Sequence, residues 1–191
     1  MSQQSEIMRH EHILHRTSAV LIVIDMQEPF VKSVVDPTGF LRDVTVLVEG
    51  FRIMEIPIIG TTQYVNRMGD ILPEIRRFLP RTPSHDKLVF DCCGSDSFLA
   101  ELKASGATQV VLCGLESHIC VNQTAHGLLA RGYQVHVVAD AISSREESNR
   151  LIGIEKMKQS GVLVSSKEMA LYELLYEAGC PNFKQVLNLV K

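Results

Sequence analysis

Val110-Val111-Leu112-Cys113-Gly114-Leu115-Glu116-Ser117-His118-Ile119-Cys120 is the stretch that says most about the fold and the chemistry of this chain. An apolar run typical of a buried strand ends at Gly114, and a helical pattern begins at Ser117. With Ser117 as the N-cap, Cys120 lies in the first helical turn, where unpaired N–H groups and the helix dipole favour negative charge. Such a setting lowers the pKa of a thiol. The stretch therefore predicts a nucleophilic thiolate.

Further apolar, β-branched runs on both sides of this stretch predict a sheet. The predicted strands cover residues 19–24, 56–61, 88–90, 109–113, 135–139 and 162–164. Apolar residues at helical spacing occupy the intervening segments 40–51, 98–102, 121–129 and 151–157. Six short apolar strands that alternate with helices predict an α/β fold with a parallel sheet covered on both faces.

The composition is that of an ordinary globular protein. The chain has 191 residues, of which 46% are hydrophobic and 21% charged, with a formal net charge of −3. We expect one domain over residues 1–191, with residues 1–16 as a polar, flexible N-terminal segment. The charge predicts no nucleic-acid partner, and the short apolar runs predict no membrane span. Five cysteines without zinc-type spacing indicate free thiols and a cytoplasmic location.

Topology predicts a partner for the cysteine. In an open parallel sheet, ligands bind beyond the carboxyl ends of the strands, where the winding reverses. If the strand order is 3-2-1-4-5-6, the first and fourth strands are neighbours at that point. Asp25 follows the first strand and Cys120 follows the fourth. We therefore expect both side chains to face one crevice.

Three motifs give the chain a family resemblance. They are Ile24-Asp25-Met26-Gln27-Glu28-Pro29-Phe30, the segment around Lys87, and Gly114-Leu115-Glu116-Ser117-His118-Ile119-Cys120-Val121. In this order they resemble the motifs of the isochorismatase-like cysteine hydrolases, from about Ala19 to the C-terminus. The Gly-Leu-Glu turn, Val138-Ala139-Asp140-Ala141 and Pro181-Asn182-Phe183-Lys184 are most similar to the branch of isochorismatase domain-containing proteins. The resemblance implies a Rossmann-like three-layer α/β/α sandwich whose six-stranded, mainly parallel sheet has the order 3-2-1-4-5-6.

The resemblance also implies a catalytic triad of Asp25, Lys87 and Cys120. Asp25 would take the proton of Cys120, and Lys87 would hold both groups, so that the thiolate attacks an amide or a related C–N compound to form a thioester. The resemblance implies backbone N–H groups of Glu116 and Cys120 as the oxyanion hole, with a cis peptide between Leu115 and Glu116.

The substrate pocket and its partners complete the expectations. Gln27, Phe30 and Tyr64 are expected to line the pocket. Residues 61–66, Thr-Thr-Gln-Tyr-Val-Asn, lack the Asp-x-His metal motif of the nicotinamidase branch. No metal and no cofactor are therefore expected. The substrate would be a small molecule, and the family resemblance implies a homo-oligomer, either a dimer or a tetramer.

Other interpretations of the same residues stay open. Taken singly, Cys120 fits a core position, Asp25 a turn and Lys87 a solvated charge. Cys92, Cys93 and Cys113 are expected to serve packing, and His118 lies two residues from Cys120, where helical residues do not face each other. Two other functions stay open: an enol-ether hydrolase that uses Asp25 as an acid on a substrate such as isochorismate, and a non-catalytic oligomeric binding or scaffold protein that keeps the fold. A Glu116 side chain that faced the pocket would favour a basic or hydrogen-bonding substrate.

Overall fold

A six-stranded parallel sheet forms the centre of the computed structural model, which describes residues 9–79 and 84–191. Its order is β3-β2-β1-β4-β5-β6, and each neighbouring pair is parallel. The strands are β1 (Ala19–Ile24), β2 (Ile58–Gln63), β3 (His85–Lys87), β4 (Gln109–Leu115), β5 (Gln134–Ser143) and β6 (Leu163–Ser165). The predicted order 3-2-1-4-5-6 is confirmed.

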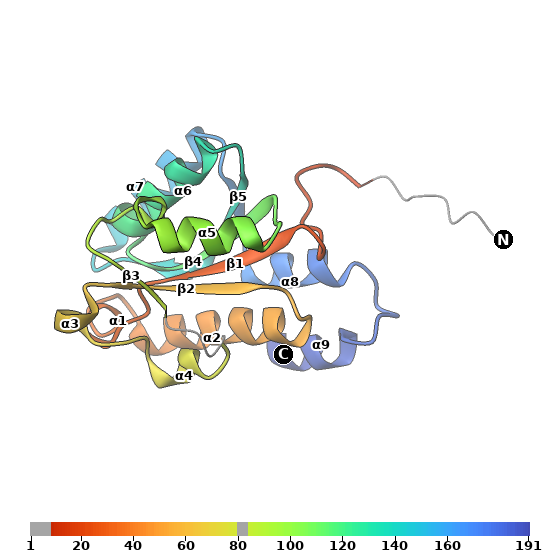
Figure 1. Cartoon of the computed structure of the whole chain (residues 1–191). Helices are drawn as coiled ribbons and strands as arrows, with labels where there is room; N and C mark the ends of the chain where they lie inside the picture. The colour runs from red at the N-terminus through yellow and green to blue at the C-terminus, as the bar shows by residue number, and fades with distance from the viewer. Residues whose placement is uncertain (1–8, 80–83) are drawn as a thin grey trace.

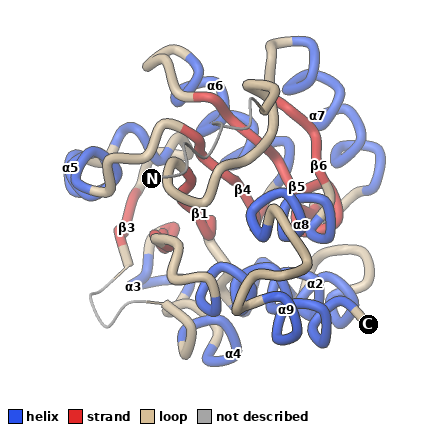
Figure 2. Tube along the Cα trace, turned by 90° about the vertical axis from the view of Figure 1, so that its right-hand side faces the viewer, coloured by secondary structure: helices blue, strands red, loops and turns tan. Residues whose placement is uncertain are grey.

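Helices cover both faces of the sheet and make three layers. They are α1 (Glu28–Val31), α2 (Pro37–Ile53), α3 (Val65–Met68), α4 (Pro73–Arg76), α5 (Asp96–Ala104), α6 (Asn122–Leu129), α7 (Glu147–Gln159), α8 (Lys167–Leu175) and α9 (Phe183–Val190). Figure 1 shows α5, α6 and α7 on one side of the sheet and α2, α4, α8 and α9 on the other. Figure 2 shows the same layers after a quarter turn.

Each face of the sheet has its own apolar core, and β1 contributes to both. Side chains of a strand alternate between the two faces. Leu21 and Val23 pack in the core that includes α2 and α8, while Ile22 and Ile24 pack in the core that includes α5 and α6. Because both faces are covered, β1 is buried throughout, which explains its unbroken apolar sequence.

The third strand differs from the prediction. The apolar residues 88–90 were expected to form it, but β3 consists of His85–Lys87, and Leu88 and Phe90 are exposed. β3 is an edge strand that pairs only with β2 over three positions, from Thr61 with His85 to Gln63 with Lys87. A short edge strand needs few apolar side chains, so its polar sequence gave no strand signal.

Residues 9–16 pack against the body of the protein. Leu14 is fully buried in the core that includes α2, and the backbone N–H of His15 donates to Gln109 Oε1 at 2.7 Å. Arg9 Nη2 donates to the carbonyl of Glu173 on α8 at 3.0 Å. Residues 9–16 are therefore held against the rest of the chain by these contacts, and residues 1–8 lie outside the described part of the chain.

The carboxyl ends of four neighbouring strands bring the candidate site together. Asp25 follows β1, Gln63 ends β2, Lys87 ends β3, and Cys120 lies in the turn after β4. Gly114 allows β1 and β4 to approach closely, because it has φ +111° and a Cβ there would collide with the carbonyl oxygen of Ile24. In the described residues, no helix is both long and apolar enough to cross a membrane.

Candidate active site

Asp25 is the centre of a buried hydrogen-bond network. Its carboxylate accepts from Thr61 Oγ1 at 2.8 Å through Oδ1 and from Lys87 Nζ at 2.7 Å through Oδ2. The side chains of Asp25 and Lys87 are both 1% exposed. A buried charge is stable only when it is paired and hydrogen-bonded, and this pair meets both conditions.

Lys87 has a second acceptor and keeps its charge. Its Nζ also donates to Gln63 Oε1 at 2.8 Å, and Gln63 Nε2 donates to the carbonyl of Leu88 at 2.8 Å. Burial is the largest single effect and acts against the ammonium charge, but the Asp25 carboxylate, together with Cys92 and Cys120, outweighs it, so the pKa of Lys87 is raised above its usual value. Lys87 is therefore a cation throughout the neutral pH range.

Cys120 lies beside Asp25 but is not a resting thiolate. Burial, and after it the negative charge of Asp25, raises the pKa of the Cys120 thiol, and Lys87 only partly opposes them. The thiol donates a hydrogen bond to Asp25, which also favours the protonated form. The expectation of a thiolate at neutral pH is therefore wrong for the resting site, because burial and the Asp25 charge oppose the helix dipole at Cys120.

The turn that carries Cys120 also differs from the prediction. Ser117–Val121 form a π-helical turn, η2, in which Val121 N donates to Glu116 O at 3.2 Å. Glu116 occupies the N-cap position, and Ser117 Oγ donates instead to the carbonyl of Ser143 at 2.9 Å. Ser117 therefore ties the turn to β5 and does not cap it. The peptide bond between Leu115 and Glu116 is cis.

A small cavity opens against Asp25 and Cys120. Its volume is about 60 Å³, and its lining residues are Asp25, Phe30, Gln63, Phe90, Leu115, Glu116, Ile119 and Cys120. Phe30 was predicted to line it, and Glu116 and Cys120 are the two residues whose N–H groups were predicted to form the oxyanion hole. Most of the other lining side chains are apolar, so the cavity fits a small molecule with an apolar face.

Two predicted pocket residues lie elsewhere. Gln27 is fully buried, and its Nε2 donates to the carbonyls of Gln63 and Gly69, so it holds the end of β2. Tyr64 has a left-handed backbone and an exposed ring that lies against Arg67. Sequence reasoning missed Gln63, Phe90 and Ile119 as lining residues. Gln63 had a signal, since it is in the segment that follows the second predicted strand.

Glu116 lines the cavity with a neutralised charge. Arg145 Nε lies 3.0 Å from Glu116 Oε1, and the backbone N–H of Arg145 donates to Oε2 at 3.2 Å. His118 Nδ1 lies 2.9 Å from Ser144 Oγ and 3.8 Å from Glu116 Oε2. Both side chains therefore connect the turn after β4 to the end of β5, and His118 is occupied away from the thiol.

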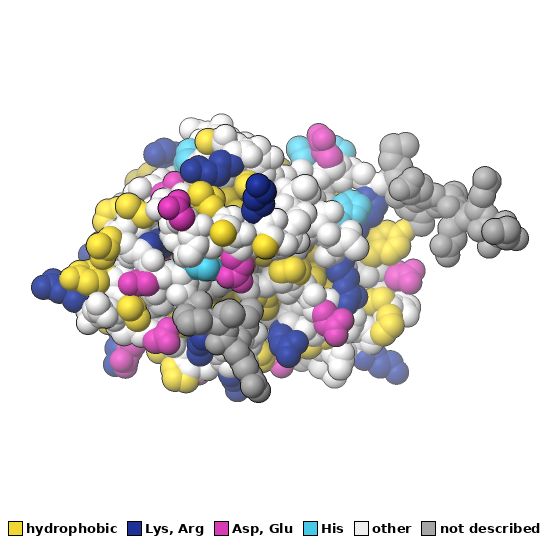
Figure 3. Space-filling view, in the orientation of Figure 1, with side chains coloured by type: hydrophobic (Ala, Val, Ile, Leu, Met, Phe, Trp, Pro, Cys, Tyr) yellow, Lys and Arg dark blue, Asp and Glu magenta, His cyan; other side chains and the backbone are white. Residues whose placement is uncertain are grey.

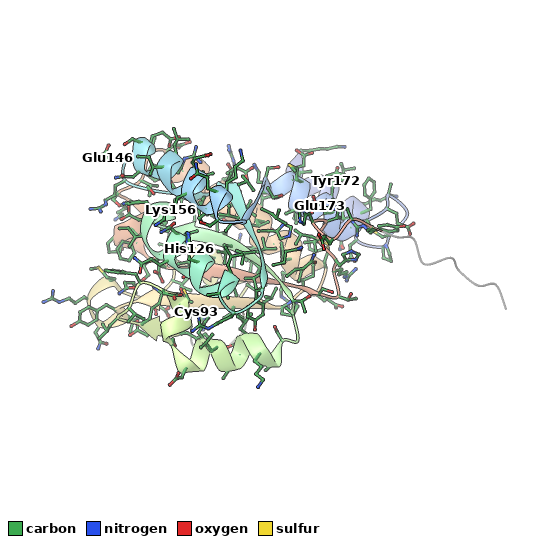
Figure 4. The ribbon with its side chains drawn as sticks, turned by 90° about the horizontal axis from the view of Figure 1, so that it is seen from above. Cys93, His126, Glu146, Lys156, Tyr172 and Glu173 are labelled. Atoms are coloured by element: carbon green, nitrogen blue, oxygen red, sulfur yellow. The ribbon has the colours of Figure 1, made fainter. Side chains whose placement is uncertain are left out.

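Three further cysteines and His126 lie outside the lining of this cavity. Cys92, Cys93 and Cys113 are buried, and burial raises the pKa of Cys92 to about 11 and of Cys93 to about 12. His126 is on α6, and its Nε2 lies 3.0 Å from Ser160 Oγ, which follows α7; Figure 4 shows His126 near Lys156 of α7. Among the described residues, no group of three or more His, Cys, Asp or Glu side chains could hold a metal ion.

The family follows from comparison with known proteins. Residues 19–169 match the family model described as the isochorismatase domain. This chain belongs to the isochorismatase family. The matched segment covers β1 to α8 and includes Asp25, Lys87 and Cys120.

Relatives place this isochorismatase-family chain near the predicted branch. It is 36% identical over 178 residues to isochorismatase domain-containing protein 2 of Danio rerio, covering 93% of this chain and 89% of that protein. It is also 36% identical over 180 residues to the secreted isochorismatase effector Isc1 of Phytophthora sojae, covering 91% and 85%.

Solved structures share the fold. The structure described as MAR1 ribonuclease from Caenorhabditis elegans has a TM-score of 0.88 and 34% identity, over 93% of this chain and 92% of that one. The Escherichia coli YcaC product, described as an octameric hydrolase of unknown specificity, has a TM-score of 0.87 and 24% identity, over 95% and 91%.

Proposed function

We propose that this isochorismatase-family chain is a metal-independent cysteine hydrolase that cleaves a small amide or a related C–N bond. The observation that carries the proposal is the Asp25 carboxylate, which accepts hydrogen bonds from both the Lys87 ammonium and the Cys120 thiol beside a cavity of about 60 Å³. A nucleophile, a base and a cation that holds the base are the groups that nucleophilic acyl transfer requires.

The first half of the reaction forms a thioester. Asp25 takes the proton of Cys120 as the sulfur attacks the carbonyl carbon, so a free thiolate is never required at rest. The N–H groups of Glu116 and Cys120 stabilise the oxyanion, since donors fixed in a dry cavity stabilise developing charge strongly. Protonated Asp25 then gives its proton to the leaving nitrogen as the C–N bond breaks, which leaves an acyl group on Cys120.

The second half releases the acid. Asp25, again ionised, takes a proton from water, and the water oxygen attacks the thioester carbon. The carbon–sulfur bond breaks, and Asp25 returns the proton to the sulfur. The carboxylic acid leaves, and the resting thiol is restored. Lys87 stays protonated through the cycle because its pKa is raised, and it keeps Asp25 in place.

The charges at the cavity favour an uncharged substrate. The two carboxylates that line it are matched, Asp25 by Lys87 and Glu116 by Arg145. A dianionic enol ether such as isochorismate would need cations that are free to bind carboxylates, and these two cations are already engaged. The small apolar cavity likewise supports a compact neutral amide over such a substrate.

A small-molecule substrate, a homo-oligomer and a cytoplasmic location complete the proposal. The net charge of −3 and the mixture of acidic and basic side chains on the face in Figure 3 do not favour binding to RNA, although one structural relative is described as a ribonuclease. The octameric Escherichia coli relative supports assembly of more than one copy. Five free cysteines support a reducing compartment, whereas the Phytophthora sojae relative is described as secreted.

The test is a screen of small amides, ureas and carbamates with the wild-type protein, Cys120→Ala and Cys180→Ala. Cys180 is partly exposed and lies far along the chain from the site, so its variant is the matched control. We expect wild type and Cys180→Ala to turn over a neutral amide and to show an acyl adduct by intact mass, and Cys120→Ala to show neither. Full activity in Cys120→Ala would remove the thiol from the mechanism and favour an enol-ether reaction through Asp25. Absence of turnover and adduct with every compound would favour the scaffold alternative.

A further inference from the structure

Thr61 lies at the point where β2 passes the proposed base. Its side chain is fully buried, and its hydroxyl donates to Asp25 Oδ1 at 2.8 Å, on the oxygen that Lys87 does not bind. The backbone adds a second link, since Asp25 N donates to the carbonyl of Thr61 at 3.2 Å. Each carboxylate oxygen of Asp25 therefore has a donor of its own.

Cys92 is placed to donate a hydrogen bond to that hydroxyl. Its Sγ lies 3.8 Å from Thr61 Oγ1 in the geometry of an S–H donor, and its own backbone N–H donates to Thr124 Oγ1 at 3.0 Å. Burial raises the pKa of Cys92 to about 11, so the thiol keeps its proton across the neutral range. The Thr61 hydroxyl then accepts a hydrogen bond from the Cys92 S–H and donates its own proton to the Asp25 carboxylate.

The short 3-10 turn η1 (Cys92–Gly94) holds Cys92 in place. Asp91 precedes it and accepts from the backbone N–H of Cys93 at 2.8 Å, so the turn has a capped start. Cys92 itself is fully buried in the core beneath α5 and α6. Cys92 therefore approaches Thr61 from within the packed core, away from solvent.

We propose that Thr61 is a positioning residue for the Asp25 base, and that Cys92, through its S–H group, orients Thr61. The chain of donors runs from Cys92 to Thr61 to Asp25, and it favours the ionised carboxylate that accepts the Cys120 proton. This role rests on the proposed hydrolase function, and it uses a buried thiol that the acyl-transfer steps leave unassigned.

The same strand supplies a matched control. Side chains of β2 alternate, so Thr62 points to the other face, where its hydroxyl donates to Asp86 Oδ1 at 3.1 Å. Thr62, like Thr61, is a buried threonine bonded to a carboxylate. Among the described residues, the charged and titratable groups that interact with Asp25 are Lys87 from β3, Cys92 from η1 and Cys120 from η2, and Glu116 lines the same cavity.

The experiment measures the pH dependence of Cys120 alkylation by iodoacetamide, read by intact mass with the other cysteines mapped, in wild type, Thr61→Val, Thr61→Ser and Thr62→Val. It needs no substrate. The acidic limb of this profile is the pH range over which labelling falls as the pH decreases. Loss of a hydrogen bond to a charged group corresponds to a shift of roughly one to two pH units. We therefore expect Thr61→Val to move the acidic limb to higher pH by about that much. Thr61→Ser, which keeps the hydroxyl, and Thr62→Val are expected to retain the wild-type limb.

Cys92→Ala separates orientation from general damage. We expect it to move the acidic limb in the wild-type background by less than Thr61→Val does, and to cause no further movement in the Thr61→Val background. A Thr61→Val profile that superimposes on wild type overturns the proposal, and so does an equal movement in Thr62→Val. If Thr61→Val does not fold, an unmoved limb in Cys92→Ala overturns it.

Turnover of the amide found in the screen is measured in parallel with these variants. We expect kcat to fall about tenfold in Thr61→Val with KM within about twofold, as for loss of one hydrogen bond that acts in the transition state. If no compound is hydrolysed by wild type, the proposed hydrolase function fails, and the alkylation profiles still decide whether Thr61 and Cys92 control Asp25.

Discussion

Removal of the buried Lys87 ammonium should lower the free energy of unfolding more than removal of an exposed charged side chain does. Lys87→Met keeps the length of the side chain but leaves the Asp25 carboxylate, 1% exposed, with only the neutral donors Thr61 and Cys120. Loss of one partner of a buried ion pair costs about 3–5 kcal/mol, because the remaining charge is uncompensated. Since domains are stable by about 5–15 kcal/mol, the variant should fold but unfold far more readily.

The measurement is urea unfolding at pH 7 of Lys87→Met, Asp25→Asn and the double variant, analysed by linear extrapolation. The double variant should lose less free energy of unfolding than the sum of the two single losses, because it leaves no buried charge. Lys32→Met is the control, since Lys32 pairs with Glu28 at 2.6 Å on the surface, where both side chains are well exposed. Its urea midpoint should equal that of wild type.

The stabilising contribution of Lys87 should depend on pH in a defined direction. The pKa of Lys87 is raised above 10.5 in the folded state, so its stabilising contribution is complete below pH 10.5 and is lost as the pH rises through the folded value. The difference between wild type and Lys87→Met should therefore be constant from pH 7 to 10. A loss under about 1 kcal/mol, or a double variant equal to the sum of the singles, would refute the idea that the two charges stabilise each other in the fold.

Three further predictions test the site and its surroundings. Burial, and then the charge of His12, lowers the pKa of His136 from 6.5 to about 4. The free energy of unfolding should therefore fall by about 3 kcal/mol in total as the pH decreases from 6.5 to 4. His136→Gln should remove this pH dependence in urea unfolding. Because the ionised Asp25 carboxylate takes the proton of Cys120 as the sulfur attacks, Asp25→Asn should abolish turnover and slow iodoacetamide labelling of Cys120 at pH 7; labelling as fast as in wild type, or faster, would contradict this account. Arg145→Met should leave the charge of Glu116 without its partner and raise kcat/KM for an ammonium-bearing amide about fivefold relative to a neutral amide. The factor follows from an attraction of roughly 1 kcal/mol between unit charges about 4 Å apart in water. An unchanged ratio of the two kcat/KM values would show that Glu116 does not reach the substrate.

The sequence predicted the meeting of Asp25 and Cys120 because both follow buried strands. β1 and β4 are neighbours over six register positions, from Ala19 with Gln109 to Ile24 with Gly114. Their apolar, β-branched sequences are long enough to identify, and parallel strands end at the same edge of a sheet. Lys87 could be named only through the family resemblance, since β3 is three residues long and polar.

The protonation state of Cys120 could not be predicted in the same way. Its position after a strand indicates a helix N-terminus, and that alone predicts a lowered pKa. The actual pKa depends on burial and on the distance to Asp25, which lies 95 positions earlier in the chain. Such long-range electrostatic effects have no local signature, so the favourable dipole was the only contribution visible in the sequence.

The second layer around Asp25 follows a rule that the sequence contained in part. Thr61 and Gln63 are two residues apart on β2, so both face the side on which Asp25 and Lys87 lie, and Thr62 faces away. The apolar run suggested that this strand ends at Thr61, whereas it continues to Gln63. An apolar run identifies the buried part of a strand but not polar residues at its end. In β2 those polar residues are the ones that lie beside the candidate site. An alternation argument that continues one period past the last apolar residue would have placed both side chains beside the base.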